Sequence, residues 1–200
     1  MLTDLLKLDW KVVLTIVYST TVLLLDGYHN FFPLKVYDRL LLYLIIPLFF
    51  IVALFRQSPA AYGFRLGDWR AGLLYTLVGC VAVTVLLYFL GKTGAFQTYY
   101  AGWGGGKLPL GLHVALDLLG WEFLFRGLLL FALLPVCGPY AILIQAIPFS
   151  IAHMGKPEVE ALSCIIGGTF FGLVAYRTNS FLYPFVIHWY LMMITVFFTR

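Results

Sequence analysis

The chain has 200 residues, of which 62% are hydrophobic and only 11% are charged, and its formal net charge is +4 at pH 7. Soluble domains carry about 25% charged residues, so this composition excludes a soluble globular protein. The basic residues are scattered, and no basic tract indicates binding to nucleic acid. The sequence therefore predicts a multi-pass protein of the cell membrane, with the lipid bilayer as a partner.

Seven apolar segments follow one another along the chain, and each reaches or approaches the length that crosses a bilayer. They are Trp10–Leu25, Leu40–Phe55, Gly72–Leu90, Leu110–Leu134, Tyr140–His153, Glu160–Tyr176 and Phe181–Phe198. Glycine and proline clusters separate them, as is typical of loops. Leu110–Leu134 is long enough for a span and an extension. We therefore expect one all-α membrane domain over residues 1–200, a helical bundle of seven or eight transmembrane helices. The predicted loops on the two sides of the membrane carry equal numbers of lysine and arginine residues, so the orientation of the protein in the membrane stays open.

Glutamate occurs only at Glu122, Glu158 and Glu160. An ionised side chain near the centre of a bilayer costs roughly 2.5–3.5 kcal/mol, so Glu122 within an apolar segment indicates a functional site. Arg126 follows four residues later, on the same face of a helix, where it can pair with Glu122. A purely structural pair is the alternative. Glu158 and Glu160 suit the positive end of a helix that starts near them, and for Glu158 we prefer this interpretation.

Two histidines complete the candidate site. His153 ends an apolar run, and His188 lies inside the last apolar segment, where an ionisable residue again indicates function. A carboxylate and imidazoles are sufficient to activate water for hydrolysis and to stabilise an oxyanion. Ser150 is not in a GxSxG elbow, and HExxH is absent. A zinc site formed by His153, His188 and a glutamate is an alternative that we disfavour, so we expect no metal and no other cofactor.

These residues resemble the CAAX-protease and bacteriocin-processing family of intramembrane glutamic proteases, also called the CPBP or ABI family. The first family motif has two glutamates, three further residues and arginine. The segment Trp121–Gly127 is similar to it, except that Trp121 stands in place of the first glutamate. The second motif has phenylalanine, three further residues and histidine, which Phe149 and His153 match.

The third family motif begins with a histidine, which His188 matches, but Met192 stands where asparagine is expected. The resemblance covers about residues 60–198 and implies a catalytic core there, after an N-terminal two-helix extension over residues 1–59. It also implies an active site in a cavity that opens within the membrane. Substrates in this family are peptide bonds near the C-terminus of membrane-attached proteins or peptides.

The resemblance and the residues together give each candidate a role in an intramembrane endopeptidase. Glu122 is expected to be the general base or to hold the water, with Glu160 as a contributing carboxylate. His153 is expected to be the partner of the water, His188 the oxyanion donor, and Arg126 the residue that orients Glu122.

The two departures from the family motifs keep alternatives open. Trp121 removes a carboxylate, and the thioether of Met192 cannot donate a hydrogen bond. Either Glu122 is rotated into the site, or Glu160 supplies the carboxylate, or catalysis is lost and the protein acts in immunity or as a scaffold. A small transporter is a further alternative, in which His113 and Asp117 would join an ion path; otherwise these two form a local helix pair. The substrate, its lipidation and the oligomeric state stay open.

Overall fold

The computed structural model describes residues 9–103, 106 and 108–200, and these residues form helices and no strands. The predictions made for residues 1–8, and for Gly104 and Gly105 in the glycine cluster between the third and fourth apolar segments, fall outside the described residues. The α-helices are α2 (Trp10–Tyr28), α3 (Lys35–Arg39), α4 (Ile46–Phe49), α5 (Trp69–Leu90), α6 (Gly94–Tyr100), α7 (Leu110–Glu122), α8 (Leu130–Cys137), α9 (Ala141–Ile151), α10 (Glu158–Thr178) and α11 (Leu182–Phe198).

Wider and tighter helical turns join several of these elements. The π-helical segments are η1 (Leu40–Ile45), η2 (Phe50–Leu54) and η4 (Phe123–Leu129), and the 3-10 segments are η3 (Pro59–Tyr62) and η5 (Gly138–Tyr140). The units from α3 to η2 and from α7 to α8 are therefore continuous helices with local changes of pitch. The predicted loop after α5 differs from the structure, because it contains the short helix α6.

Five helical runs in the described part of the chain are long and apolar enough to cross a membrane, and α11 is a shorter apolar helix. One of the five, Leu110–Ile151, has 42 residues. As one straight helix it would be about 63 Å long, roughly twice the hydrocarbon thickness of a bilayer. The chain instead turns back at Gly138, where φ is +54°, so the run has two arms. The resulting seven helical units match the seven predicted segments, and the all-α membrane bundle is confirmed.

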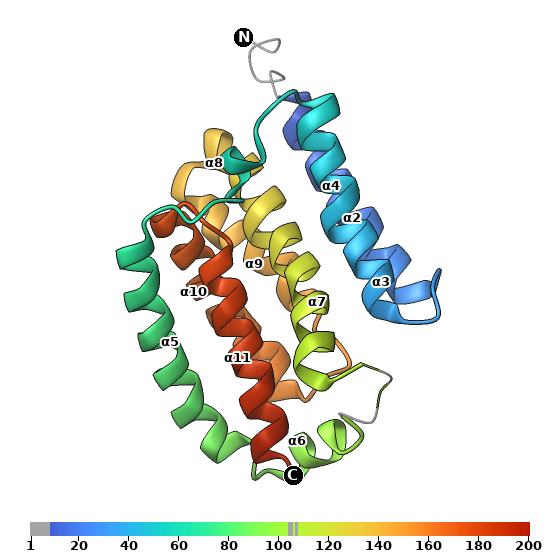
Figure 1. Ribbon diagram of the computed structural model, residues 1–200, viewed down its shortest axis with the longest axis vertical. Helices are drawn as coiled ribbons and strands as arrows, with labels where there is room; N and C mark the ends of the chain where they lie inside the picture. The colour runs from blue at the N-terminus through green and yellow to red at the C-terminus, as the bar shows by residue number, and fades with distance from the viewer. Residues whose placement is uncertain (1–8, 104–105, 107) are drawn as a thin grey trace.

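The bundle has a central group of helices and two flanks (Figure 1). Helices α7, α9, α10 and α11 lie centrally, α5 packs along α11, and α2 with the α3–η2 unit lies on the opposite side. Helix α7 packs against α3 and η1, and α2 packs against η4 and α8. The N-terminal helices are therefore in direct contact with the segments that carry Glu122 and Arg126.

The contact between α9 and α10 depends on glycine. A Cβ at Gly172 would lie 2.5 Å from Nε2 of Gln145. Gln145 is fully buried and donates to the carbonyl oxygens of Ile142 and Gly168, both at 2.8 Å. Small residues allow close helix approach in membranes, where packing rather than hydrophobic exclusion drives association. The glycines of α10 thus bring its backbone onto α9.

We predict that Gly172→Ala destabilises the protein by about 1–3 kcal/mol, because the new methyl group overpacks the buried Gln145. Thermal unfolding in detergent micelles measures this as a lower midpoint. Gly167→Ala is the matched control on the same helix, since a Cβ there would meet no atom within 4 Å. The control should be as stable as the wild type or more stable. Equal midpoints for the two variants would contradict the packing argument.

Candidate active site

The Glu122 carboxylate is at the centre of the site and is fully buried. Its Oε1 accepts a hydrogen bond from Arg126 Nη1 at 3.0 Å, as the spacing of four residues predicts. The same oxygen lies 2.6 Å from Nδ1 of His188, which is 66 residues further along the chain. Glu122 therefore joins η4 and α11 at the end of α7. Its Oε2 has no hydrogen-bond partner in the described part of the protein.

Arg126 is enclosed by protein and is also fully buried. Its guanidinium carbon lies 3.9 Å from the centroid of the Phe149 ring and 5.2 Å from that of Phe171. Nη2 donates to the carbonyl oxygen of Gly168 at 3.4 Å. Cation–π contacts strengthen when the cation is removed from water, so these rings help to hold the charge. Arg126 is thereby fixed from α9 and α10 as well as by Glu122.

The helix changes pitch at this site. Helix α7 ends at Glu122, and the π-helical segment η4 begins at the next residue and contains Arg126. Single π-helical turns inside α-helices occur often at functional sites, because they change the direction in which side chains point. Every residue of η4 is buried. The change of pitch therefore lies within the core of the bundle.

His153 lies in the segment between α9 and α10, outside both apolar helices. Its Nδ1 is 2.7 Å from the carbonyl oxygen of Phe149. A carbonyl can only accept, so Nδ1 carries the proton and Nε2 is an acceptor in the neutral ring. Burial, with a smaller contribution from the nearby Lys156 cation, lowers the pKa of His153 to about 3. His153 is therefore neutral near pH 7.

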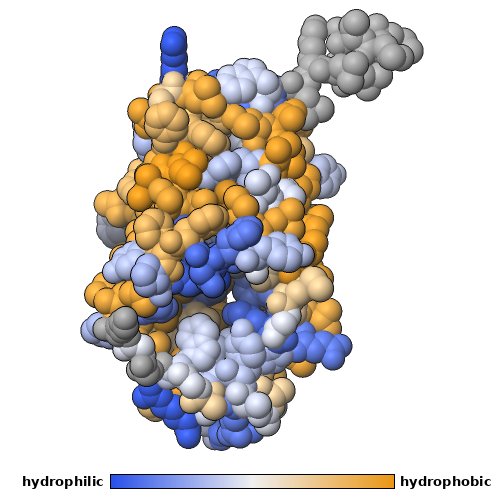
Figure 2. Space-filling view, turned by 90° about the vertical axis from the view of Figure 1, so that its right-hand side faces the viewer, coloured by the Kyte–Doolittle hydropathy of each residue, from blue (hydrophilic) through white to orange (hydrophobic). Residues whose placement is uncertain are grey.

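A cavity of about 320 Å³ adjoins these groups. His153 and His188 line it together with Trp121 and Met192, but Glu122 is not in its lining. Both histidines use Nδ1 inside the protein, and their Nε2 atoms have no partner among the described residues. The two imidazoles therefore face the cavity, with the carboxylate behind one of them. On the face turned towards the viewer in Figure 2, a hollow bordered by hydrophilic side chains lies next to hydrophobic surface.

Glu160 is not joined to this group. Both of its carboxylate oxygens accept from the Tyr100 hydroxyl at 2.8 Å, and Oε1 also pairs with Lys156 Nζ at 2.7 Å. Glu160 is absent from the lining of the cavity, whereas Lys156 is part of it. The structure thus ties Glu160 to α6 rather than to Glu122. Glu158 is exposed in the first turn of α10, as expected for a residue at a helix start.

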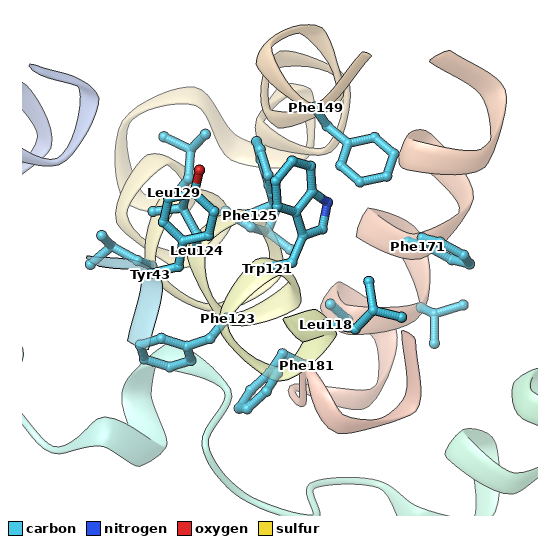
Figure 3. Close-up of a cluster of buried hydrophobic side chains, with 14 of the residues drawn as sticks. Tyr43, Leu118, Trp121, Phe123, Leu124, Phe125, Leu129, Phe149, Phe171 and Phe181 are labelled. Carbon is cyan, nitrogen blue, oxygen red and sulfur yellow. The ribbon is translucent and has the colours of Figure 1, made fainter. Parts of the chain in front are cut away.

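Trp121 lies within a cluster of buried aromatic side chains (Figure 3). Its ring centroid is 5.8 Å from that of His153, with the ring planes at 80°, and 5.4 Å from that of Phe125. The indole Nε1 is buried and has no hydrogen-bond partner in the described chain. Trp121 and Met192, the two departures from the family motifs, are therefore both in the wall of one cavity.

A second charged group at this cavity was not predicted from the sequence. Arg39 binds both carboxylate oxygens of Asp117 through Nη1, at 2.9 and 2.7 Å, and its Nε is 3.2 Å from Asp26 Oδ2. The hypothesis of a local pair between His113 and Asp117 is thus wrong for the described structure, since Arg39 is the partner that Asp117 has there. The rarity of charge in apolar segments could have singled out Arg39 and Asp117, but not their pairing.

Among the described residues, no three histidine, cysteine, aspartate or glutamate side chains are grouped so that they could hold a metal ion. His188 uses its Nδ1 for Glu122, and Glu122 also pairs with Arg126. The expectation of a site without metal stays a prediction. The donor set itself is suited to proton transfer, because it combines one buried carboxylate with two imidazoles that each have a ring nitrogen available.

Comparison with models of protein families gives a match over residues 111–194 to the family described as Rce1-like, type II CAAX prenyl endopeptidase Rce1-like. No curated protein and no solved structure matches the chain. The matched segment begins in α7, ends in α11 and contains Glu122, Arg126, His153 and His188. At the level of the family, this match supports a CAAX-type intramembrane endopeptidase, which is a hydrolase. The predicted resemblance to the CAAX-protease family is therefore confirmed over residues 111–194, which build the candidate site of this multi-pass helical membrane protein.

Proposed function

We propose that the protein is an intramembrane endopeptidase of the cell membrane that hydrolyses a peptide bond of a membrane-attached protein or peptide near its C-terminus. The observation that carries the proposal is the buried contact of 2.6 Å between Glu122 and His188, next to a cavity that both histidines line. Ionisable side chains inside an apolar bundle cost free energy, so a cluster of them that is retained there indicates a function. The reaction that we propose uses water and needs no cofactor.

His188 is the proposed general base. Its Nδ1–H donates to the Glu122 carboxylate, which orients the ring and stabilises the imidazolium that forms when Nε2 takes a proton. Glu122 itself is fully buried and outside the lining of the cavity, so it acts through His188 rather than on the water directly. Arg126 is a positioning residue, because its guanidinium holds the carboxylate without reaching the cavity.

His153 has the complementary role of holding the water. Its neutral ring offers Nε2 as an acceptor to one water hydrogen, while the second hydrogen points to Nε2 of His188. Its low pKa makes it a weak base, so the proton goes to His188. The two acceptors together fix the water, and its oxygen lone pair is then free to attack the carbonyl carbon of the substrate.

The proposed reaction conserves atoms and charge at each step. The water oxygen forms a bond to the carbonyl carbon as its proton moves to His188 Nε2, and the carbonyl oxygen becomes the oxyanion. The imidazolium of His188 stabilises the oxyanion, and its proton then passes to the amine nitrogen as the C–N bond breaks. The products are a carboxylic acid and an amine, and His188 returns to its neutral form.

We predict that Glu122→Gln lowers kcat for a membrane-tethered peptide reporter by about 10²-fold or more, because His188 loses the charge that stabilises its imidazolium. Glu160→Gln is the matched control, since it makes the same chemical change at a carboxylate bound to Lys156 and Tyr100. It should cleave within a few-fold of the wild type. Cleavage is measured in proteoliposomes with purified protein.

Removing one partner of a buried ion pair can destabilise a protein by 3–5 kcal/mol, so thermal unfolding of both variants must accompany the assay. His188→Gln, which leaves the Glu122–Arg126 pair intact, should lose activity to a similar extent as Glu122→Gln. If folded Glu122→Gln and His188→Gln proteins both cleave like the wild type, the proposed catalytic roles are wrong. A folded wild-type protein that never cleaves but retains its cellular effect would instead favour a scaffold or immunity role.

We also predict a pH dependence of stability that comes from His153. Its pKa is about 3 in the folded protein and about 6.5 when unfolded, so between these values the unfolded chain binds a proton that the folded protein does not. Stability should therefore fall as pH decreases from about 6.5, by up to about 1.4 kcal/mol per pH unit. His153→Gln should remove this part of the slope in thermal unfolding scans. If stability falls equally steeply with decreasing pH in the wild type and in His153→Gln, the predicted contribution of His153 is contradicted.

A further inference from the structure

A second hollow, here called the α2–α9 groove, lies on the other side of Trp121. It has a volume of about 500 Å³ and is lined by apolar residues of α2, such as Leu23 and Leu24, and of α9, such as Ile151. Leu24 and Ile151 are exposed on the surface of the bundle. Trp121, Arg39 and Ala152 line both this groove and the catalytic cavity. These three residues therefore form the wall between the two spaces.

Arg39 holds the indole in this wall. Its guanidinium carbon is 5.1 Å from the centroid of the Trp121 ring. The guanidinium is fixed in turn by Asp117 at 2.7 Å and by Asp26 at 3.2 Å. Asp117 is four residues before Trp121 on α7, and Asp26 belongs to α2. The ion pairs thus connect the N-terminal helix, the wall and the helix that ends at Glu122.

Aromatic packing fixes the other side of the indole. The Trp121 ring centroid is 5.6 Å from that of Tyr43 and 5.4 Å from that of Phe125. The ring of His153 meets it edge to face from the cavity side, at 5.8 Å. Figure 3 shows Tyr43, Phe125 and Phe149 arranged around the indole. A side chain that is 7% exposed and held on several sides is a rigid partition rather than a mobile surface residue.

We propose that Trp121, held by Arg39, is a specificity-determining residue that limits the size of the side chain accepted next to the scissile bond. The inference rests on the proposed endopeptidase function. The indole closes the catalytic cavity at about 320 Å³, although a mostly apolar space of about 500 Å³ lies directly behind it. A smaller residue at position 121 would join the two spaces, and the enlarged site would accept bulky apolar side chains.

The test compares membrane-tethered reporters that carry alanine, leucine or phenylalanine beside the scissile bond. The wild type should prefer alanine, whereas Trp121→Ala and Trp121→Leu should raise the ratio of kcat/KM for phenylalanine over alanine by about tenfold or more. Leu24→Ala is the matched control, because Leu24 lines the groove but not the cavity, and its truncation leaves the wall in place. That variant should leave the ratio unchanged within a few-fold. An unchanged ratio in both folded Trp121 variants would overturn the proposal.

A variant that fills the groove provides a second and independent test. Gly27 lines the groove, and a Cβ there would meet no atom within 4 Å, so Gly27→Phe adds a bulky side chain to the lining of the groove without a clash from its first carbon. Gly27→Phe alone should leave kcat/KM for all three reporters unchanged, because the wall already separates the bound reporter from the groove. Combined with Trp121→Ala, it should reverse the gain for phenylalanine. If Gly27→Phe alone impairs the phenylalanine reporter, substrates already use the groove and the wall is not the limit.

Binding separates this proposal from the proposed catalysis. Analogues of the same three reporters with a reduced, non-cleavable amide bond are titrated into wild type and Trp121→Ala in detergent micelles. The same change in size preference is expected in Kd. If the wild type binds the analogues and Trp121→Ala changes the preference, but no reporter is cleaved, the proposed catalysis fails and the size limit stands. If reporters are cleaved but neither Kd nor kcat/KM changes its preference, only the size limit fails.

Discussion

The burial of the Glu122 carboxylate is the constraint on which the rest of the structure depends. A charge removed from water costs several kcal/mol unless its partners are close and well oriented. Glu122 has two such partners, Arg126 at 3.0 Å and His188 at 2.6 Å. Because His188 comes from α11, satisfying the carboxylate also fixes α11 against the end of α7. The interaction on which the proposed catalysis depends is therefore also one that holds the bundle together.

The same constraint explains the surroundings of Arg126. A guanidinium with no access to water must exchange hydration for carbonyl oxygens and aromatic faces, and Gly168 and Phe149 supply them. Glycine is needed at position 168, because a Cβ there would lie 2.8 Å from the Phe149 ring and 3.4 Å from Nη2 of Arg126. Helix packing and the electrostatics of the site are thus satisfied by the same close approach of α10.

The helices and the pair of Glu122 with Arg126 were predictable because they depend on short-range patterns in the sequence. Apolar length identifies the spans, and a spacing of four residues places Glu122 and Arg126 on one face. The partner of Asp117 was not predictable, since nothing in the spacing of Arg39 relates it to a residue 78 positions later. The role of Glu160 was uncertain for a similar reason. Closeness in sequence to His153 suggested a contribution to the site, yet its bonds are to Tyr100 and Lys156.

The sequence by itself determined that this is a helical membrane protein and that its three glutamates all lie between residues 122 and 160. It also determined that Glu122, Arg126, His153 and His188 follow one another in an order that resembles the motifs of the CAAX-protease family. Tertiary structure alone decided which of these residues meet. It put Glu122 behind His188 rather than in the cavity, and it made Trp121 a wall between two spaces. The physical reason is that burial and ion pairing depend on how helices pack across the bundle, whereas local periodicity reports only which face of each helix is apolar.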